Sequence, residues 1–102
     1  MNIEPLKSLC SYIRNDSLDT DTYGYFNDFC VFRFCEIFNT ITVFTPSVPF
    51  KPEFLCKDGS CHNWTYKVFT SPQDALNELI QAIAKIKYIQ VQSKFQRINN
   101  DF

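Results

Sequence analysis

Residues 23–38, YGYFNDFCVFRFCEIF, decide the fold, because they hold seven aromatic side chains in sixteen positions. Alternate residues of an extended strand point to opposite faces of a sheet. Phe32 and Phe34 fall on one such face, and Val31 and Ile37 fall on the other, so both faces are apolar. The sequence therefore predicts a strand over residues 29–38 that is covered on both sides, by the rest of the fold or by a partner.

Two further strands follow from the pattern on the C-terminal side. The segment 41–45 is rich in β-branched residues, and the short Asn39-Thr40 gap before it favours a hairpin with the preceding strand. Apolar and polar residues alternate over 64–69, which predicts a half-buried strand. Between them lie three prolines that predict an extended connector: Pro46, Pro49 and Pro52.

Helices are expected at both ends of the chain. Apolar residues at helical spacing predict a helix over 4–14, with Pro5 in its first turn. Ser71 and Pro72 are a strong helix start, and the apolar stripe that follows predicts a helix over 72–96. Residues 88–98 also fit a strand, but we expect the helix to continue through them.

Composition describes a globular chain of 102 residues, 45% hydrophobic and 17% aromatic, with a net charge of −1. This aromatic content argues against disorder, and the near-zero charge gives no global electrostatic reason to bind nucleic acid or an anionic membrane. We predict a single α+β domain over 1–102. Its expected order is α-β-β-β-α, with an antiparallel three-stranded sheet packed with two helices.

The N-terminus carries Glu4 and Pro5 where an export signal needs a basic start and an apolar run. We therefore expect a cytoplasmic protein. The five cysteines are an odd number, so reduced thiols are the expected state.

Cysteine spacing suggests an alternative function, a metal- or redox-responsive module that uses Cys56, Cys61 and His62. The four-residue gap between Cys56 and Cys61, like that between Cys30 and Cys35, differs from the two-residue gap of zinc knuckles. We accordingly predict no metal and no cofactor.

An acidic turn resembles part of a calcium-binding loop, with Asp19, Asp21, Gly24 and Asn27 at ligand positions. Cys30 stands where such a loop needs a bidentate glutamate, so no calcium site is predicted.

A second alternative function is weak nucleic-acid binding through the C-terminal helix. Its basic residues are Lys85, Lys87, Lys94 and Arg97. Lysines near the C-terminal end of a helix are also explained by their favourable interaction with the helix dipole. We therefore expect that the chain does not bind nucleic acid.

No catalytic motif is present, and we expect a non-enzymatic protein-binding or regulatory module of the adaptor, inhibitor or immunity type. Proteins of this size and kind include phage or viral ones. A homodimer is a further expectation, because surplus apolar faces become interfaces. The predicted contact residues are the aromatics of one strand region and an arginine among them: Tyr23, Tyr25, Phe26, Phe29, Phe32, Arg33 and Phe34.

Overall fold

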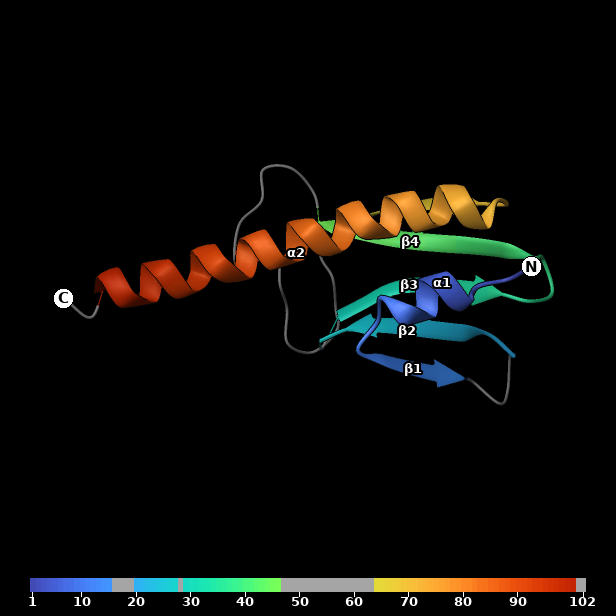
Figure 1. Cartoon of the computed structure of the whole chain (residues 1–102), viewed down its shortest axis with the longest axis horizontal. Coiled ribbons are helices and arrows are strands. Elements are labelled where there is room, and N and C mark those ends of the chain that lie inside the picture. The colour runs from blue at the N-terminus through green and yellow to red at the C-terminus, as the bar shows by residue number, and fades with distance from the viewer. Residues whose placement is uncertain (16–19, 28, 47–63, 101–102) are drawn as a thin grey trace.

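A computed structural model describes residues 1–15, 20–27, 29–46 and 64–100, and the side chains of the last segment as far as Val91. In these residues it contains two helices and one antiparallel sheet of five strands (Figure 1). The elements are α1 (Glu4–Ser8), β1 (Tyr12–Asn15), β2 (Thr22–Phe26), β3 (Phe29–Cys35), β4 (Thr40–Pro46), β5 (Trp64–Phe69) and α2 (Pro72–Asn100). The strands form a meander in the order β1-β2-β3-β4-β5.

The C-terminal part of the sequence prediction is confirmed. The segment 41–45 lies within β4, the segment 64–69 is β5, and the helix predicted over 72–96 lies within α2. Residues 88–98 are therefore helical. The cap of this helix is also as expected, since the backbone N–H of Asp74 donates to Oγ of Ser71 at 3.4 Å.

The helix predicted over 4–14 is wrong beyond Ser8. Residues Tyr12–Asn15 instead form β1, which pairs with β2 so that Tyr12 lies opposite Tyr25 and Asn15 opposite Thr22. The apolar spacing fitted a helix, but an isolated helix of this length has little stability in water. Pairing with β2 satisfies the same backbone groups and anchors the segment to the sheet.

The aromatic stretch 23–38 is not one strand. Its first residues belong to β2, which the sequence did not predict, and the strand predicted over 29–38 corresponds to β3 alone. Asn27 has a φ of 55°, in the left-handed region that asparagine tolerates. Its N–H donates to Oγ of Ser11 at 2.9 Å. The strand also ends at Cys35, and a turn containing Asn39, with a φ of 54°, leads into β4. The expected hairpin before β4 is therefore confirmed, while the three-stranded sheet is corrected to five.

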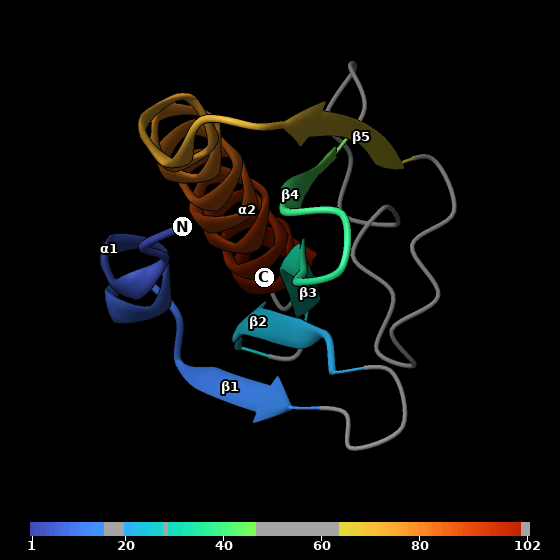
Figure 2. The same ribbon diagram turned by 90° about the vertical axis from the view of Figure 1, so that its right-hand side faces the viewer.

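Both helices cover the same face of the sheet, as Figure 2 shows. Leu79, Ala82 and Ile86 of α2 are fully buried and belong to one core cluster with Ile41 and Val43 of β4. Leu6 of α1 is fully buried in the same cluster. The opposite face of the sheet, which carries neither helix, is called the outer face below.

A bulge in β2–β3 explains why β3 is apolar on consecutive positions. Gly24 lies opposite Phe32, but the next pair is Tyr25 with Cys30, so Val31 is an extra residue. Val31 and Phe32 are both fully buried. Strict alternation fails at this point, and two neighbouring side chains enter the core.

Gly24 makes room for the Phe32 ring. A Cβ atom at position 24 would overlap the ring of Phe32 and would lie 2.8 Å from Sγ of Cys10. Glycine is therefore required here by close packing between β2, β3 and the segment after α1.

Gly24→Ala should lower the free energy of unfolding by about 1–3 kcal/mol, because the new methyl group must displace an aromatic ring in a packed core. Urea denaturation followed by circular dichroism measures this. The double variant Gly24→Ala/Phe32→Leu should recover part of the loss, since the smaller side chain removes the overlap. Equal stability of Gly24→Ala and the native chain would show that the overlap is absent.

Candidate binding site on the outer face of the sheet

A row of directly opposed residues crosses the outer face. Arg14 lies opposite Tyr23, Tyr23 opposite Arg33, Arg33 opposite Thr42, and Thr42 opposite Val68. Opposed residues of antiparallel strands project to the same side. The flanking residues Phe32 and Val43 are in the core with the helices, so this row points away from the helices.

Five residues at the β1–β2–β3 end of this face form a compact group, which we call the aromatic–arginine cluster. The Tyr12 and Tyr25 rings lie 5.2 Å apart, tilted by 38°. Cζ of Arg14 is 4.7 Å from the centre of the Tyr23 ring and 5.8 Å from that of Tyr25. Cζ of Arg33 is 5.7 Å from the Tyr23 ring. Tyr23 is therefore in cation–π contact with a guanidinium from each neighbouring strand.

The cluster is accessible at its edges. Tyr12 is 54% exposed, and the Arg33 side chain is 46% exposed. Tyr23 and Tyr25 are half-buried, and burial raises the pKa of Tyr25, a shift to which the nearby Cys30 also contributes. Tyr25 is thus neutral at physiological pH, and the cationic groups of the cluster are its two arginines.

Arg33 is held in place by a buried carboxylate. Asp21 is only 2% exposed, and its Oδ2 accepts from Nε of Arg33 at 2.6 Å and lies 2.5 Å from Nη2. This hydrogen bond raises the pKa of Arg33 further above its usual range. Thr20, with a φ of 60°, turns the chain immediately before Asp21. Arg33 is therefore a fixed cation.

Arg14 differs from Arg33 in its charge environment. Among the described residues, no carboxylate lies within ion-pair distance of its guanidinium, which contacts the tyrosine rings instead. The Asp21 carboxylate offsets the charge of Arg33, so within the part of the chain that the structure describes, Arg14 is the member of the cluster whose charge has no ion-pair partner.

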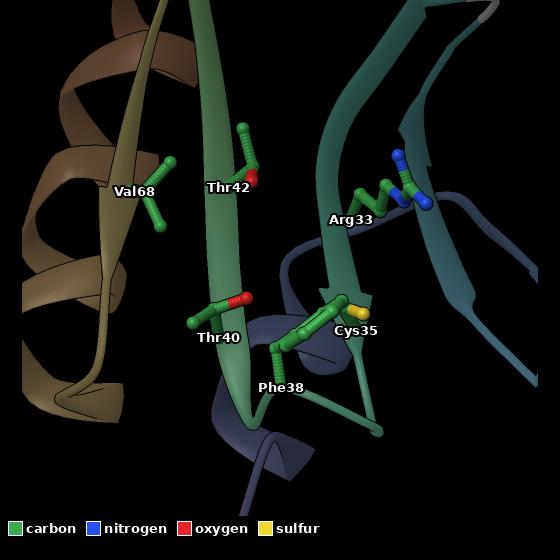
Figure 3. Close-up of a pocket in the computed structure, with 6 residues that line it drawn as sticks. All are labelled: Arg33, Cys35, Phe38, Thr40, Thr42 and Val68. Atoms are coloured by element: carbon green, nitrogen blue, oxygen red, sulfur yellow. The ribbon is translucent and has the colours of Figure 1, made fainter.

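A shallow depression adjoins the cluster through Arg33. It has a volume of about 260 Å³ and is lined by Arg33, Cys35, Phe38, Thr40, Thr42 and Val68. In Figure 3 the Arg33 side chain extends from β3 toward β2, and the helices lie behind the strands. The lining offers hydroxyl groups and apolar carbon beside one cation, which suits an aliphatic or aromatic side chain of a ligand.

The seven predicted contact residues separate into three groups. Tyr23, Tyr25 and Arg33 lie in the aromatic–arginine cluster. Phe29 and Phe32 are in the core, 6% and 0% exposed, so the sequence placed them wrongly on a surface. Phe26 and Phe34 are half-buried against that core. Strand pairing and the bulge, which the sequence did not reveal, turn these rings inward.

Sequence reasoning missed two members of the cluster, Tyr12 and Arg14. The helix predicted over 4–14 contains both residues, and a helix there does not bring them onto the sheet beside Tyr23 and Tyr25. The alternation of exposed Tyr12, half-buried Ile13 and exposed Arg14 is a strand pattern. That alternation was the available signal, but it extends over only four residues.

The metal- and redox-related alternatives receive no support from the described chain. Cys56, Cys61 and His62 lie outside the described residues, as does Asp19 of the calcium-like frame. Among the residues that are described, no three His, Cys, Asp or Glu side chains lie together as metal ligands. Cys10, Cys30 and Cys35 are thiols that form no disulfide, and Gly24 of the calcium-like frame is in a strand rather than a loop.

The basic residues of the nucleic-acid alternative occupy the C-terminal half of α2. Lys87 is exposed, with its Nζ 5.6 Å from the centre of the Phe26 ring, and Tyr88 is 55% exposed. Lys85 is half-buried. This group lies apart from the aromatic–arginine cluster, on the other side of the sheet.

Comparison of the chain with protein-family models, with curated proteins and with solved structures finds no match. Within the described residues, neither helix is long and apolar enough to cross a membrane.

The Arg33–Asp21 pair supports a stability prediction. Arg33→Met should lower the free energy of unfolding by about 1–3 kcal/mol, because it removes the hydrogen bond and the ion pair that Arg33 makes with a buried carboxylate. Arg14→Met is the matched control and should cost less, about 0.5–1 kcal/mol, because it removes only the cation–π contacts of an exposed guanidinium. The double variant Arg33→Met/Asp21→Asn should be less destabilised than the two single losses combined. Strict additivity in chemical denaturation would contradict the pairing.

Cys10 should be a poor nucleophile. Burial raises its pKa from 9.0 to about 11, and Cys30 adds to the shift. As the pH rises, the native state therefore keeps the Cys10 proton after the unfolded chain has lost it. The contribution of Cys10 to the stability of the fold is fully present below pH 9 and is lost as the pH rises from 9.0 to about 11.

Iodoacetamide labelling at pH 8, read by peptide mass spectrometry, should modify Cys10 far more slowly in the native chain than in urea. The native rate should rise steeply as the pH approaches 11. Equal rates in the folded and unfolded chains at pH 8 would contradict the burial of this thiol.

Proposed function

We propose that this chain is a non-enzymatic protein-binding module, and that the aromatic–arginine cluster on the outer face is its contact surface. The observation that carries the proposal is the placement of Tyr23 between the guanidinium groups of Arg14 and Arg33 on a face that neither helix covers. Tyrosine and arginine are enriched among the residues that dominate binding energy at protein interfaces.

Rigidity supports the same proposal. Tyr23 and Tyr25 are on a central strand, and Arg33 is fixed by Asp21, so these side chains lose little conformational freedom when a partner binds. Tyr12 lies on the edge strand β1 and packs on Tyr25, which extends the apolar surface to the edge of the sheet. A partner surface that fits this cluster has apolar or aromatic groups at its centre.

Charge defines a second property of the partner. The guanidinium of Arg14 can donate two parallel hydrogen bonds to a carboxylate, and it has no ion-pair partner among the described residues. We therefore propose a partner that presents an Asp or Glu side chain beside apolar residues. The depression next to Arg33 accommodates one further apolar side chain.

Within this class, the proposed biological role is that of a cytoplasmic adaptor, inhibitor or immunity-type protein. Such proteins act by occupying a surface of another protein and need no catalytic group. A phage or viral source agrees with this role and remains a proposal.

The test uses four immobilised chains in a lysate of the source organism: native, Tyr12→Ala, Arg14→Glu and Tyr66→Ala. Tyr66 is 69% exposed on β5, outside the cluster, and serves as the matched control for Tyr12. Proteins quantified by mass spectrometry should include one that is captured by the native and Tyr66→Ala chains and lost from the other two. Titration of that purified protein should then show at least a roughly tenfold weaker Kd for Arg14→Glu.

A captured protein whose affinity is the same for all four chains would contradict the assignment of the cluster. A second binding experiment, with a labelled single-stranded oligonucleotide, tests whether the cluster binds nucleic acid instead. If it binds the native chain tightly, loses affinity steeply with salt and requires Arg14, the outer face is a nucleic-acid surface and the proposal is overturned.

A further inference from the structure

Helix α2 has a second apolar stripe on the side away from the core. Ile80, Tyr88 and Val91 are 50%, 55% and 63% exposed, and Ala84 between them is exposed as well. These positions are separated by three or four residues, so they lie on one side of the helix. The buried residues Leu79, Ala82 and Ile86 lie on the opposite side. The helix is therefore apolar on both sides over this region.

The helix also reaches beyond the sheet. In Figure 1 its C-terminal part continues past the ends of the strands, and the longest dimension of the molecule is 52 Å against 26 and 23 Å for the others. Among the described side chains of α2, which end at Val91, Ile89 is the last that is buried. An amphipathic helix such as α2 gains most of its stability from the packing of its apolar side chains. The exposed apolar stripe along the protruding part of α2 therefore favours packing against another helix.

Charge along α2 identifies that partner. The segment 72–84 carries Asp74 and Glu78 and no basic residue, whereas the segment 85–100 carries four basic residues and no acidic one. Two copies of α2 in antiparallel orientation bring the acidic half of each beside the basic half of the other. The parallel orientation would place the two basic halves together, which is unfavourable.

We infer that α2 is a self-association surface on which a second copy of this chain packs, with the two α2 helices antiparallel. A crossing point between Ala84 and Tyr88 brings the backbone of Asp74 about level with that of Arg97 from the second copy. The small Ala84 at the crossing allows the helices to approach closely, at the 8–10 Å spacing of packed helices. The arrangement has two-fold symmetry, so each copy contributes the same residues and the contact closes on itself. This surface is separate from the aromatic–arginine cluster and does not depend on its proposed role.

Light scattering and sedimentation of the full chain over a concentration series should show a monomer–dimer equilibrium. Val91→Glu should weaken dimerisation by at least about tenfold, because it removes a valine that the contact between the two copies would bury and places a carboxylate there. The matched control is Val68→Glu, since Val68 is 56% exposed on β5, and this variant should dimerise like the native chain. Far-UV circular dichroism confirms that both variants keep their secondary structure. A strict monomer at every concentration, or equal dimerisation of the two variants, would overturn the inference.

The antiparallel orientation of the two α2 helices is tested by exchanging charged residues and measuring self-association at low salt. Asp74→Arg and Arg97→Asp should each weaken self-association, and the double variant Asp74→Arg/Arg97→Asp should restore it, because each copy again meets opposite charge. A double variant no better than the single variants would overturn the antiparallel arrangement. A dimer lost on Tyr12→Ala but kept on Val91→Glu would place self-association on the outer face and overturn the α2 assignment.

Discussion

The packing of Phe32 against Gly24 is the constraint on which the arrangement of this molecule depends. An aromatic ring lies over the one position of β2 that has no side chain, and Cys10 closes the same space from the segment after α1. Three parts of the chain that are far apart in sequence therefore meet at one point. Because the ring enters the core here, the neighbouring residues Tyr23, Tyr25 and Arg33 project to the other side of the sheet.

The two faces of the sheet consequently have different chemistry. The face toward the helices is built from aliphatic residues of α2 and β4 with Phe29 and Phe32, and it supplies the burial that stabilises the fold. The outer face holds tyrosine rings between two guanidinium groups, one of which is anchored by Asp21. Among the described aromatic residues, the two buried rings are those of Phe29 and Phe32, and every tyrosine is half-buried or exposed.

Sequence patterns predicted the C-terminal half of the described fold well, because long, regular signals determine it. The Ser71 cap, Pro72 and a repeated apolar spacing defined α2, and alternation defined β5. The N-terminal half depends on contacts between distant residues, and there the prediction failed. The strand β1 is too short for its own alternation to identify it, and its pairing with β2 defines it. The bulge at Val31 breaks the alternation from which faces are assigned.

The candidate site was predicted in part for the same reason. An arginine flanked by aromatics predicts contact residues at Tyr23, Tyr25 and Arg33, and these three lie together on the outer face. The phenylalanines selected with them could not be separated without knowing the strand register. Arg14 and Tyr12 join the cluster only through the β1–β2 pairing, which places Arg14 opposite Tyr23 and Tyr12 opposite Tyr25.

The central claim is that the cluster is a solvent-accessible surface on a sheet whose other face is sealed by α2. Signal loss caused by a soluble paramagnetic gadolinium chelate, measured by NMR for assigned side chains, tests it most directly. The account predicts that the side-chain signals of Tyr12 and Arg14 are strongly attenuated, and that those of Phe32 and Leu79 keep their intensity. Equal protection of all four side chains would show that the outer face is covered, and would contradict the account.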